Sequence, residues 1–177
     1  MNIRDAADGD ERVLAEITVR SWQAAYRHIL PASLLENMKT DQREAGWREE
    51  LKAKNWIIFI AEEAGTPIGW IALGKARDPG CGPGVMELFG IYLDPNAWHQ
   101  GVGRDLLEHG LERIPTEGVR EVVLWVFEEN HQARAFYERN GFVLEPDSRK
   151  LIEIKGSSYP EVRYRRTMPA PTTKDPA

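Results

Sequence analysis

The chain has 177 residues, of which 42% are hydrophobic and 29% charged, and its formal net charge at neutral pH is −5. This length suits one domain with its own core, because domains commonly have about 100–150 residues. The acidic balance argues against nucleic acid as the main partner, since that binding depends on neutralising phosphates with Lys and Arg. It suits a cationic acceptor, although many proteins are acidic for solubility alone.

The sequence predicts no membrane segment, because its longest apolar run is far shorter than the ~18 residues that a span needs. Residues 1–5 do not begin a secretory signal, which has an apolar stretch behind a basic one. The one cysteine, Cys81, cannot form an internal disulfide. We therefore expect a cytoplasmic protein.

The first third of the chain predicts a short strand followed by three helices. Residues 3–6 form the strand, and Asp8 or Asp10 caps a helix that extends to Tyr26. Pro31 opens a second, short helix, and a third runs from Thr40 to Leu51 with one solvated side.

The middle of the chain predicts three strands. Residues 56–61 and 68–73 form a hairpin around a turn at Gly65. Residues 78–84 are rich in Gly and Pro and predict a flexible loop. A strand over 85–93 follows, and Asp94-Pro95 ends it, since proline cannot donate to a strand ladder.

The last third predicts a helix from Gly101 to Pro115, a strand over 122–127 that is apolar on both faces, and a helix capped by Asn130. Gly141 is placed to end that helix. Residues 142–144 and 161–168 are the last predicted strands. Residues 169–177 predict a disordered tail, so we expect a single domain over 1–168.

The segment Gln100-Gly101-Val102-Gly103-Arg104 has the outline of an anion site. Glycines let the backbone approach a ligand, and the free N–H groups of the first helical turn and the helix dipole favour negative charge. Arg104 adds a positive charge that the dipole alone would disfavour. By itself the pattern also describes a tight strand-to-helix connection. It is neither a Walker loop nor a dinucleotide fingerprint, because Leu106 stands where the third glycine should be.

A second motif follows the turn. It comprises Leu124-Trp125-Val126-Phe127, then Asn130, Ala133, Phe136-Tyr137-Glu138 and Asn140-Gly141-Phe142. Together the two motifs resemble the GNAT N-acetyltransferase superfamily over residues 85–142. The resemblance implies an α/β (α+β) fold, with a mixed, mostly antiparallel sheet of six or seven strands and about four helices. Two parallel central strands would splay around acyl-CoA.

This sequence departs from the family pattern at one position. The family motif usually reads Gln or Arg, two residues, Gly, one residue, then Gly or Ala, and here Trp98 occupies the first position, followed by His99 and Gln100. Phosphate contacts in the family come mainly from backbone amides. The change therefore affects one side-chain contact rather than the site.

The resemblance implies which residues bind the acyl donor, acetyl-CoA. The backbone amides of the turn would hold the pyrophosphate, namely those of His99, Gln100, Gly101, Val102, Gly103 and Arg104. The end of the 85–93 strand, at Ile91, Tyr92 and Leu93, would pair with the pantetheine arm. Asn130, Ala133 and Phe136 would also contact the donor, although Asn130 is equally explained as a helix cap.

The resemblance also implies two catalytic residues. Tyr137 matches the residue that protonates the departing CoA thiolate, and its alternative is a packed core tyrosine. Glu87 is the candidate base for the protonated amine. Alternation places it on the face of Phe89 and Ile91, where a carboxylate is costly without a purpose. Its alternative is a solvent-facing strand-end residue.

Other reactive side chains predict no further chemistry. Cys81 has no adjacent base for a nucleophile. The four histidines lack metal-ligand spacing, so no metal is expected; they are His28, His99, His109 and His131. Trp22 and Tyr26 lie one helical turn apart and either line the acceptor pocket or pack in the core.

The expected activity is transfer of an acetyl or acyl group from acetyl-CoA to a primary amine by direct attack, with a small-molecule amine favoured. A protein or peptide N-terminus is the alternative acceptor. The alternative function is a degenerate acyl-CoA-binding sensor or interaction module. Acceptor identity, acyl-chain preference and oligomeric state stay open, although the late strands over 151–168 could pair with a second subunit to form a homodimer.

Overall fold

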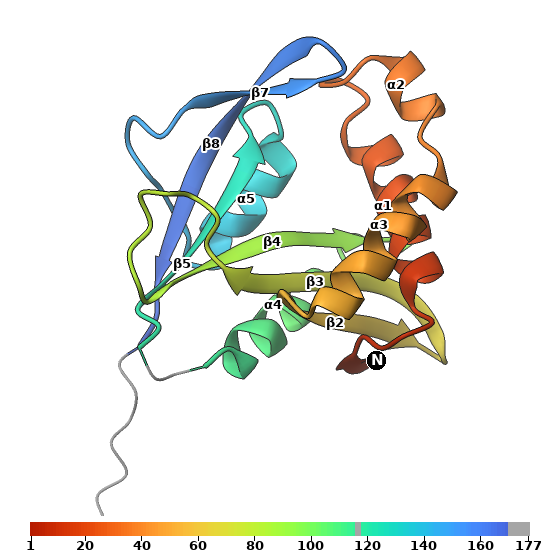
Figure 1. The fold of residues 1–177 in the computed structure, drawn as a ribbon, viewed down its shortest axis with the longest axis horizontal. Coiled ribbons are helices and arrows are strands. Elements are labelled where there is room, and N and C mark those ends of the chain that lie inside the picture. Colours follow the sequence, from red (N-terminus) through yellow and green to blue (C-terminus); the bar gives the residue numbers. More distant parts are fainter. Residues whose placement is uncertain (116–117, 170–177) are drawn as a thin grey trace, which may run out of the picture. The chain divides into compact units, whose positions relative to one another are not determined.

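The computed structural model describes residues 1–115 and 118–169, so the predicted tail lies outside the described residues except for Pro169. Figure 1 labels the elements. In chain order they are β1 (Asn2–Asp5), α1 (Glu11–Ala25), α2 (Ala32–Glu36), α3 (Thr40–Ala53), β2 (Trp56–Glu63), β3 (Thr66–Lys75), β4 (Val85–Leu93), the 3-10 helix η1 (Pro95–Ala97), α4 (Val102–Arg113), β5 (Glu121–Phe127), α5 (His131–Arg139), β6 (Val143–Leu144), β7 (Lys150–Ile154) and β8 (Ser157–Thr167).

The strands follow the order β1-β2-β3-β4-β5-β8-β6, and β7 pairs with β8. β4 and β5 run parallel, with Val85 opposite Glu121 and Glu87 opposite Val123. The other registered pairs are antiparallel. The predicted mixed, mostly antiparallel sheet with a parallel central pair is thus confirmed, with eight strands among the described residues.

The chain divides into two compact units, and strand β4 passes through both. The first comprises residues 1–74 and 88–113, and the second comprises 75–87 and the described residues from 114 onwards. The single domain over 1–168 and a homodimer through residues 151–168 stay predictions.

In the first unit, α1 and α3 cover one face of the β2–β3 hairpin. Leu14 and Ile17 of α1 and Trp47 of α3 pack with Ile60 of β2 and Trp70 of β3 in one buried cluster. The rings of Trp47 and Trp70 meet edge to face, with 4.7 Å between centroids. Because strand side chains alternate between faces, the neighbouring positions are left for a second helix.

Helix α4 packs against the opposite face of the same hairpin. His109 lies edge-on to Phe59, with 4.8 Å between ring centroids. At Gly110 a Cβ atom would lie 2.8 Å from Leu73 Cδ1 and 3.1 Å from Ile71 Cδ1. Glycine therefore lets α4, which follows the candidate phosphate turn, pack close to the strands.

The predicted cap of α1 is correct in position but not in contact. Asp10 is the N-cap residue, yet its side chain makes no capping bond to the helix. Its carboxylate instead accepts bonds from Ala7 N and from Arg4 at 2.7 and 2.9 Å. The bonds from Arg4 hold the pKa of Asp10 below its ordinary value.

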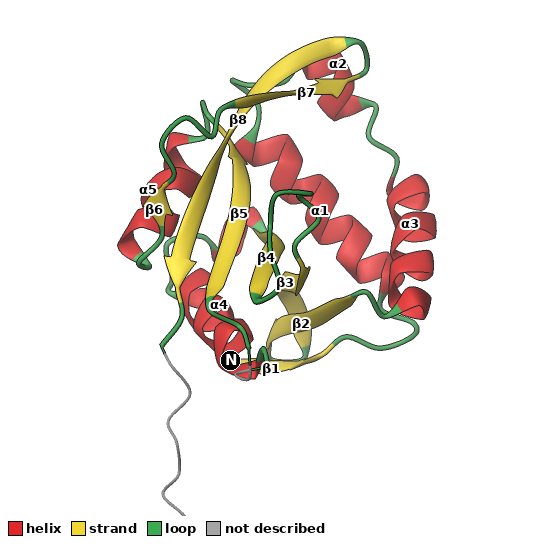
Figure 2. Ribbon diagram, turned by 60° about the vertical axis from the view of Figure 1, so that its left-hand side comes forward, coloured by secondary structure: helices red, strands yellow, loops and turns green. Residues whose placement is uncertain are grey.

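In the second unit, β5 and β8 lie side by side over their length, from Glu121 opposite Thr167 to Phe127 opposite Glu161 (Figure 2). Helix α5 covers one face of this pair, where Tyr137 packs near Tyr164 with 6.5 Å between ring centroids. The other face carries charged side chains and is described below.

Within the late strands expected over 151–168 only residues 161–168 had predicted bounds, so the bounds of β7 and the first four residues of β8 come from the structure. These two segments form a hairpin in which Ile154 lies opposite Ser157. Lys155 and Gly156 form its two-residue turn and have φ angles of 50° and 81°. Positive φ at both positions is typical of the hairpin turn that matches strand twist.

Gly84 sits where a side chain cannot be accommodated. Its φ is +89°, and a Cβ atom would collide with the backbone oxygen of Gly118. We therefore expect Gly84→Ala to lower the free energy of unfolding by about 2–4 kcal/mol, from left-handed strain plus the clash. Urea titration measures this. Gly82→Ala is the matched control in the same loop, because a Cβ there meets no atom within 4 Å. Equal midpoints for the two variants would contradict the argument.

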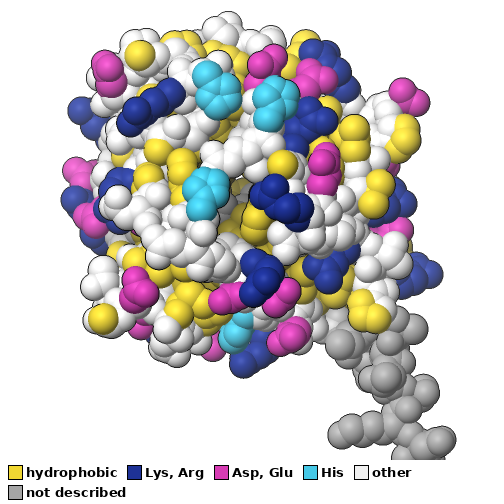
Figure 3. All heavy atoms as spheres, turned by 180° about the vertical axis from the view of Figure 1, so that it is seen from behind, with side chains coloured by type: hydrophobic (Ala, Val, Ile, Leu, Met, Phe, Trp, Pro, Cys, Tyr) yellow, Lys and Arg dark blue, Asp and Glu magenta, His cyan; other side chains and the backbone are white. Residues whose placement is uncertain are grey.

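None of the helices described over 1–115 and 118–169 is both long and apolar enough to cross a membrane. On the face drawn in Figure 3, Lys and Arg side chains are interspersed with Asp and Glu. Such a mixed surface differs from the single-sign basic field that polyanion binding uses.

Candidate functional site

The connection from β4 to α4 is held by hydrogen bonds of Asp94. Its backbone N–H donates to Ile68 O at 2.8 Å, and its backbone oxygen accepts from Ala97 N at 2.8 Å. Its side chain accepts from Asn96 N at 3.0 Å and from Arg20 Nε at 2.7 Å. The predicted Asp-Pro strand end is therefore a rigid turn that directs the chain into α4.

The predicted anion turn has the positive φ angle that its first glycine allows. His99 and Gly101 have φ angles of 61° and 87°, and α4 begins at Val102. Asp105 N donates to Gly101 O at 3.1 Å, so the preceding N–H groups fall in the first turn, which has no intrahelical acceptors. A Cβ on Gly101 would meet no atom within 4 Å. The turn thus presents backbone donors beside open space.

Two side chains of the turn make hydrogen bonds to the backbone, and a third is exposed to solvent. Trp98 Nε1 donates to Leu93 O at 3.3 Å, and Gln100 Nε2 donates to Asn96 O at 2.6 Å. Trp98, the departure from the family pattern, therefore braces the turn against the end of β4. Arg104 is exposed, and its one ion pair within residues 1–115 and 118–169 is a 3.4 Å contact with Asp105, which leaves its guanidinium accessible.

Trp22 and Tyr26 belong to an aromatic group in the first unit. Their rings meet edge to face at 5.0 Å, and Trp22 stacks near Tyr92 at 6.5 Å. The guanidinium of Arg43 lies 4.5 Å from the Trp22 ring centroid. Among the described residues Trp22 Nε1 is buried without a hydrogen-bond partner. The ring contacts are those of a packed core, but the indole N–H of Trp22 has no acceptor there.

Helix α5 carries the second predicted motif. Asn130 is buried, and its Oδ1 accepts from Ala133 N at 3.1 Å, so its role as a helix cap is present. Tyr137 is 8% exposed and packs near Phe136 and Phe142, with centroids at 5.4 and 5.8 Å. Both readings of these residues from sequence remain compatible with this packing.

Glu87 is buried at 3% exposure rather than facing solvent. Its Oε1 accepts from Arg77 Nη2 at 2.5 Å, and its Oε2 accepts from Arg77 Nε at 3.1 Å and from Arg77 N at 3.0 Å. A bidentate pair of this kind satisfies both carboxylate oxygens. The cost of burying this carboxylate is thus offset by Arg77, ten residues earlier in the chain.

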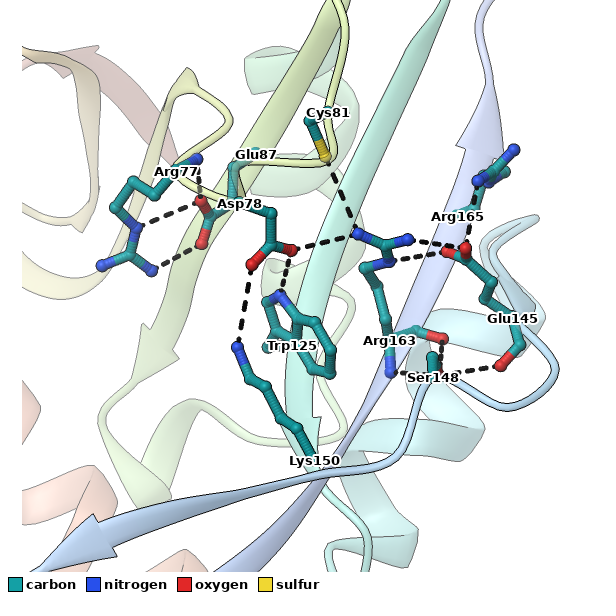
Figure 4. A network of polar contacts seen from close by, with 10 residues as sticks. All are labelled: Arg77, Asp78, Cys81, Glu87, Trp125, Glu145, Ser148, Lys150, Arg163 and Arg165. Atoms are coloured by element: carbon teal, nitrogen blue, oxygen red, sulfur yellow. Dashed lines mark hydrogen bonds and ion pairs between the residues drawn. The ribbon is translucent and has the colours of Figure 1, made fainter.

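Asp78 and Arg163 link the loop before β4 to β5 and β8 (Figure 4). Asp78 Oδ2 accepts from Trp125 Nε1 at 2.7 Å and from Arg163 Nη1 at 3.1 Å. Arg163 also binds both oxygens of Glu145 at 2.6 Å, which lowers the pKa of that carboxyl. The loop predicted to be flexible is therefore tied down at Asp78.

Lys150 and Cys81 complete this network. Lys150 Nζ lies 3.5 Å from the Trp125 ring centroid, a cation–π contact. Burial raises the pKa of the Cys81 thiol, which disfavours the thiolate a nucleophile needs. Trp125 lies in the second sequence motif, but no sequence signal indicated that it would meet Asp78 and Arg163. No group of three or more potential metal-ligating side chains occurs within the described ranges.

Comparisons with known proteins agree with the fold and with the family that the sequence resembles. The acetyltransferase (GNAT) family matches residues 18–142. A "probable N-acetyltransferase" of Mycobacterium tuberculosis is 28% identical over 173 residues, which cover 97% of this chain and 96% of the relative.

Two further likenesses come from Thermoplasma acidophilum. Its spermidine N(1)-acetyltransferase is 27% identical over 150 residues, which cover 82% of this chain and 89% of the relative. The crystal structure of its PaiA N-acetyltransferase in complex with coenzyme A has a TM-score of 0.72 at 23% identity, covering 94% of this chain and 98% of that one. With the family matching most of its length, this chain belongs to the GNAT acetyltransferase family and is an N-acetyltransferase of that type.

Proposed function

We propose that the chain acetylates the primary amine of a small molecule, with acetyl-CoA as the donor. The observation that carries the donor half is the turn at His99 and Gly101, which presents first-turn amides of α4 beside open space. The acceptor half is supported by the likeness to a spermidine acetyltransferase over most of both chains. The net charge of −5 also suits a cationic acceptor.

The turn fits a pyrophosphate in its chemistry. Acetyl-CoA supplies the acetyl group as a thioester, and its pyrophosphate is dianionic. The amides of residues 99–104 donate hydrogen bonds to it in our proposal, and the α4 dipole favours its charge. The exposed guanidinium of Arg104 adds a screened attraction.

The backbone of β4 and residues at the start of α5 are proposed to hold the pantetheine arm of the donor. The backbone of β4 at Ile91, Tyr92 and Leu93 pairs with the pantetheine amides. Asn130 keeps its Oδ1 on the α5 cap, so the proposed donor contact falls to its Nδ2 group. Ala133 and Phe136, which follow on the same helix, are proposed to contact the pantetheine arm.

Two residues are candidates for proton transfer, Tyr137 as the acid and Glu87 as the base. Tyr137 donates its hydroxyl proton to the departing thiolate. The family resemblance implies Glu87 as the base, but both of its oxygens accept from the Arg77 guanidinium, so neither is available to the amine while this pair is closed. Trp22 and Tyr26 are proposed to line the acceptor pocket, where the unused indole N–H of Trp22 can donate to the acceptor.

Thiol release from acetyl-CoA over an amine panel tests this function. The panel contains polyamines, aminoglycosides, amino acids and peptides with free N-termini. We expect turnover to rise with at least one small amine and to stay at the hydrolytic background with peptides. Turnover with peptides alone would contradict the small-molecule acceptor and support a protein N-terminus.

A further inference from the structure

One face of the sheet in the second unit carries charged and aromatic side chains in rows set by strand register. Directly opposite residues of paired strands share a face. Trp125 of β5 lies opposite Arg163 of β8, and Phe127 lies opposite Glu161. Glu161 in turn lies opposite Lys150 of β7. Since strand side chains alternate with a period of two, both rows face the same side.

The acidic side chains drawn in Figure 4 already bind arginine. Glu87 binds Arg77, whereas Asp78 and Glu145 share Arg163. Glu161 is half-buried, and in the described part of the chain its carboxylate has no hydrogen bond or ion pair. Unlike Glu87, Asp78 and Glu145, Glu161 therefore has a carboxylate that can pair with a cationic ligand.

The surroundings of Glu161 favour a proton acceptor. Burial raises its pKa above the ordinary value; Glu87 and Asp78 act in the same direction, and Lys150 and Arg77 oppose them. A carboxylate with a raised pKa is a stronger base than an ordinary one. Keeping it half-buried and unpaired costs folding free energy, which is the pattern of groups that act on ligands.

We propose that Glu161 binds the ammonium group of the acceptor and takes its proton, and that Glu87 instead holds Arg77 in place. This role rests on the acetyl transfer proposed above. It assigns the amine to the face formed by β5, β8 and β7, next to Phe127. The acceptor class is then a primary alkylamine that arrives as a cation.

The proposed step balances as follows. The ammonium nitrogen gives one proton to the Glu161 carboxylate, and its lone pair forms the C–N bond to the acetyl carbonyl carbon. The C–S bond breaks and its electron pair stays on sulfur, which takes the proton of the Tyr137 hydroxyl. The nitrogen loses its second proton to water, Glu161 releases its proton to water and Tyr137 regains one. One proton is released in each turnover.

A matched pair of acceptors tests this role: an alkylamine that the wild type acetylates, and its aminooxy analogue, whose nitrogen is already unprotonated at neutral pH. We expect Glu161→Gln to lower kcat/KM about 100-fold for the alkylamine and less than about 3-fold for the analogue, because only the first needs a base. Glu161→Asp should recover part of the loss. Glu153→Gln, an exposed carboxylate of β7, is the control and should match wild type with both acceptors.

Thermal unfolding separates this role from a structural one. A carboxylate whose pKa is raised by folding adds stability below its ordinary pKa and loses it as pH rises through the raised value. Glu161→Gln should therefore have a higher Tm than wild type at neutral pH, and this gap should close in acid. Glu87→Gln should lower Tm, because Arg77 loses its anion.

Three results would overturn the proposal. An unchanged alkylamine rate in Glu161→Gln removes Glu161 alone and leaves the proposed function standing. Equal losses with both acceptors would show that Glu161 does not take the proton. A wild type that releases thiol with no small amine would overturn the acceptor class, and the role of Glu161 with it.

Discussion

Replacing Tyr137 with phenylalanine is expected to lower kcat about 100-fold at saturating amine, the usual worth of a general acid. The change removes one hydroxyl and keeps the ring, which packs near Phe136, Phe142 and Tyr164. The donor would bind as before, so the KM for acetyl-CoA should change less than about 3-fold. Steady-state rates of thiol release over both substrates measure the two parameters.

Tyr164→Phe is the matched control, because it removes a hydroxyl from the same aromatic layer. That hydroxyl donates to Glu138 Oε1 at 2.6 Å and accepts from Arg134 Nε at 3.0 Å. Its loss should cost about 1–3 kcal/mol of unfolding free energy and leave kcat near wild type. If Tyr137→Phe keeps its kcat, or if both variants lose rate equally, Tyr137 is not the acid.

The elements with local signals were predictable from sequence. Strand β4 has the predicted bounds because Asp94-Pro95 ends it, and α5 begins after Asn130 because that side chain caps Ala133 N. The bounds of strand β7 were not predicted within the late strands expected over 151–168: β7 is only five residues long, and its alternation of half-buried and exposed positions is too brief to stand out. The turn at Lys155 and Gly156 was its best local signal.

The turn at Gly101 could be predicted because backbone conformation and helix start are local properties. The environment of the carboxylates could not. Glu87 is paired by Arg77 from within a loop whose Gly and Pro content indicated only irregular structure. Glu161 is set apart by what its neighbours bind, and these neighbours come together through the register of β5, β7 and β8. Such long-range pairing has no signature in a single sequence.

A negative charge at Gly101 is expected to raise the KM for acetyl-CoA about 10- to 100-fold with little change in kcat. The substituted side chain would project into the open space beside the first-turn amides, where the pyrophosphate is proposed to bind. Gly101→Asp is therefore compared with Gly101→Asn, because both residues tolerate the left-handed φ of 87° and differ mainly in charge.

The ratio of the two KM values isolates the electrostatic part. It should fall as salt rises, since the Debye length shortens from about 10 Å at 0.1 M to about 3 Å at 1 M. Gly65→Asp in the exposed β2–β3 turn is the control, because Gly65 has a φ of 78° and open space but precedes no helix. Equal KM values for the Asp and Asn variants at position 101 would mean that no phosphate lies beside this turn. A charge-dependent rise absent at position 65 would tie donor affinity to the first-turn amides of α4.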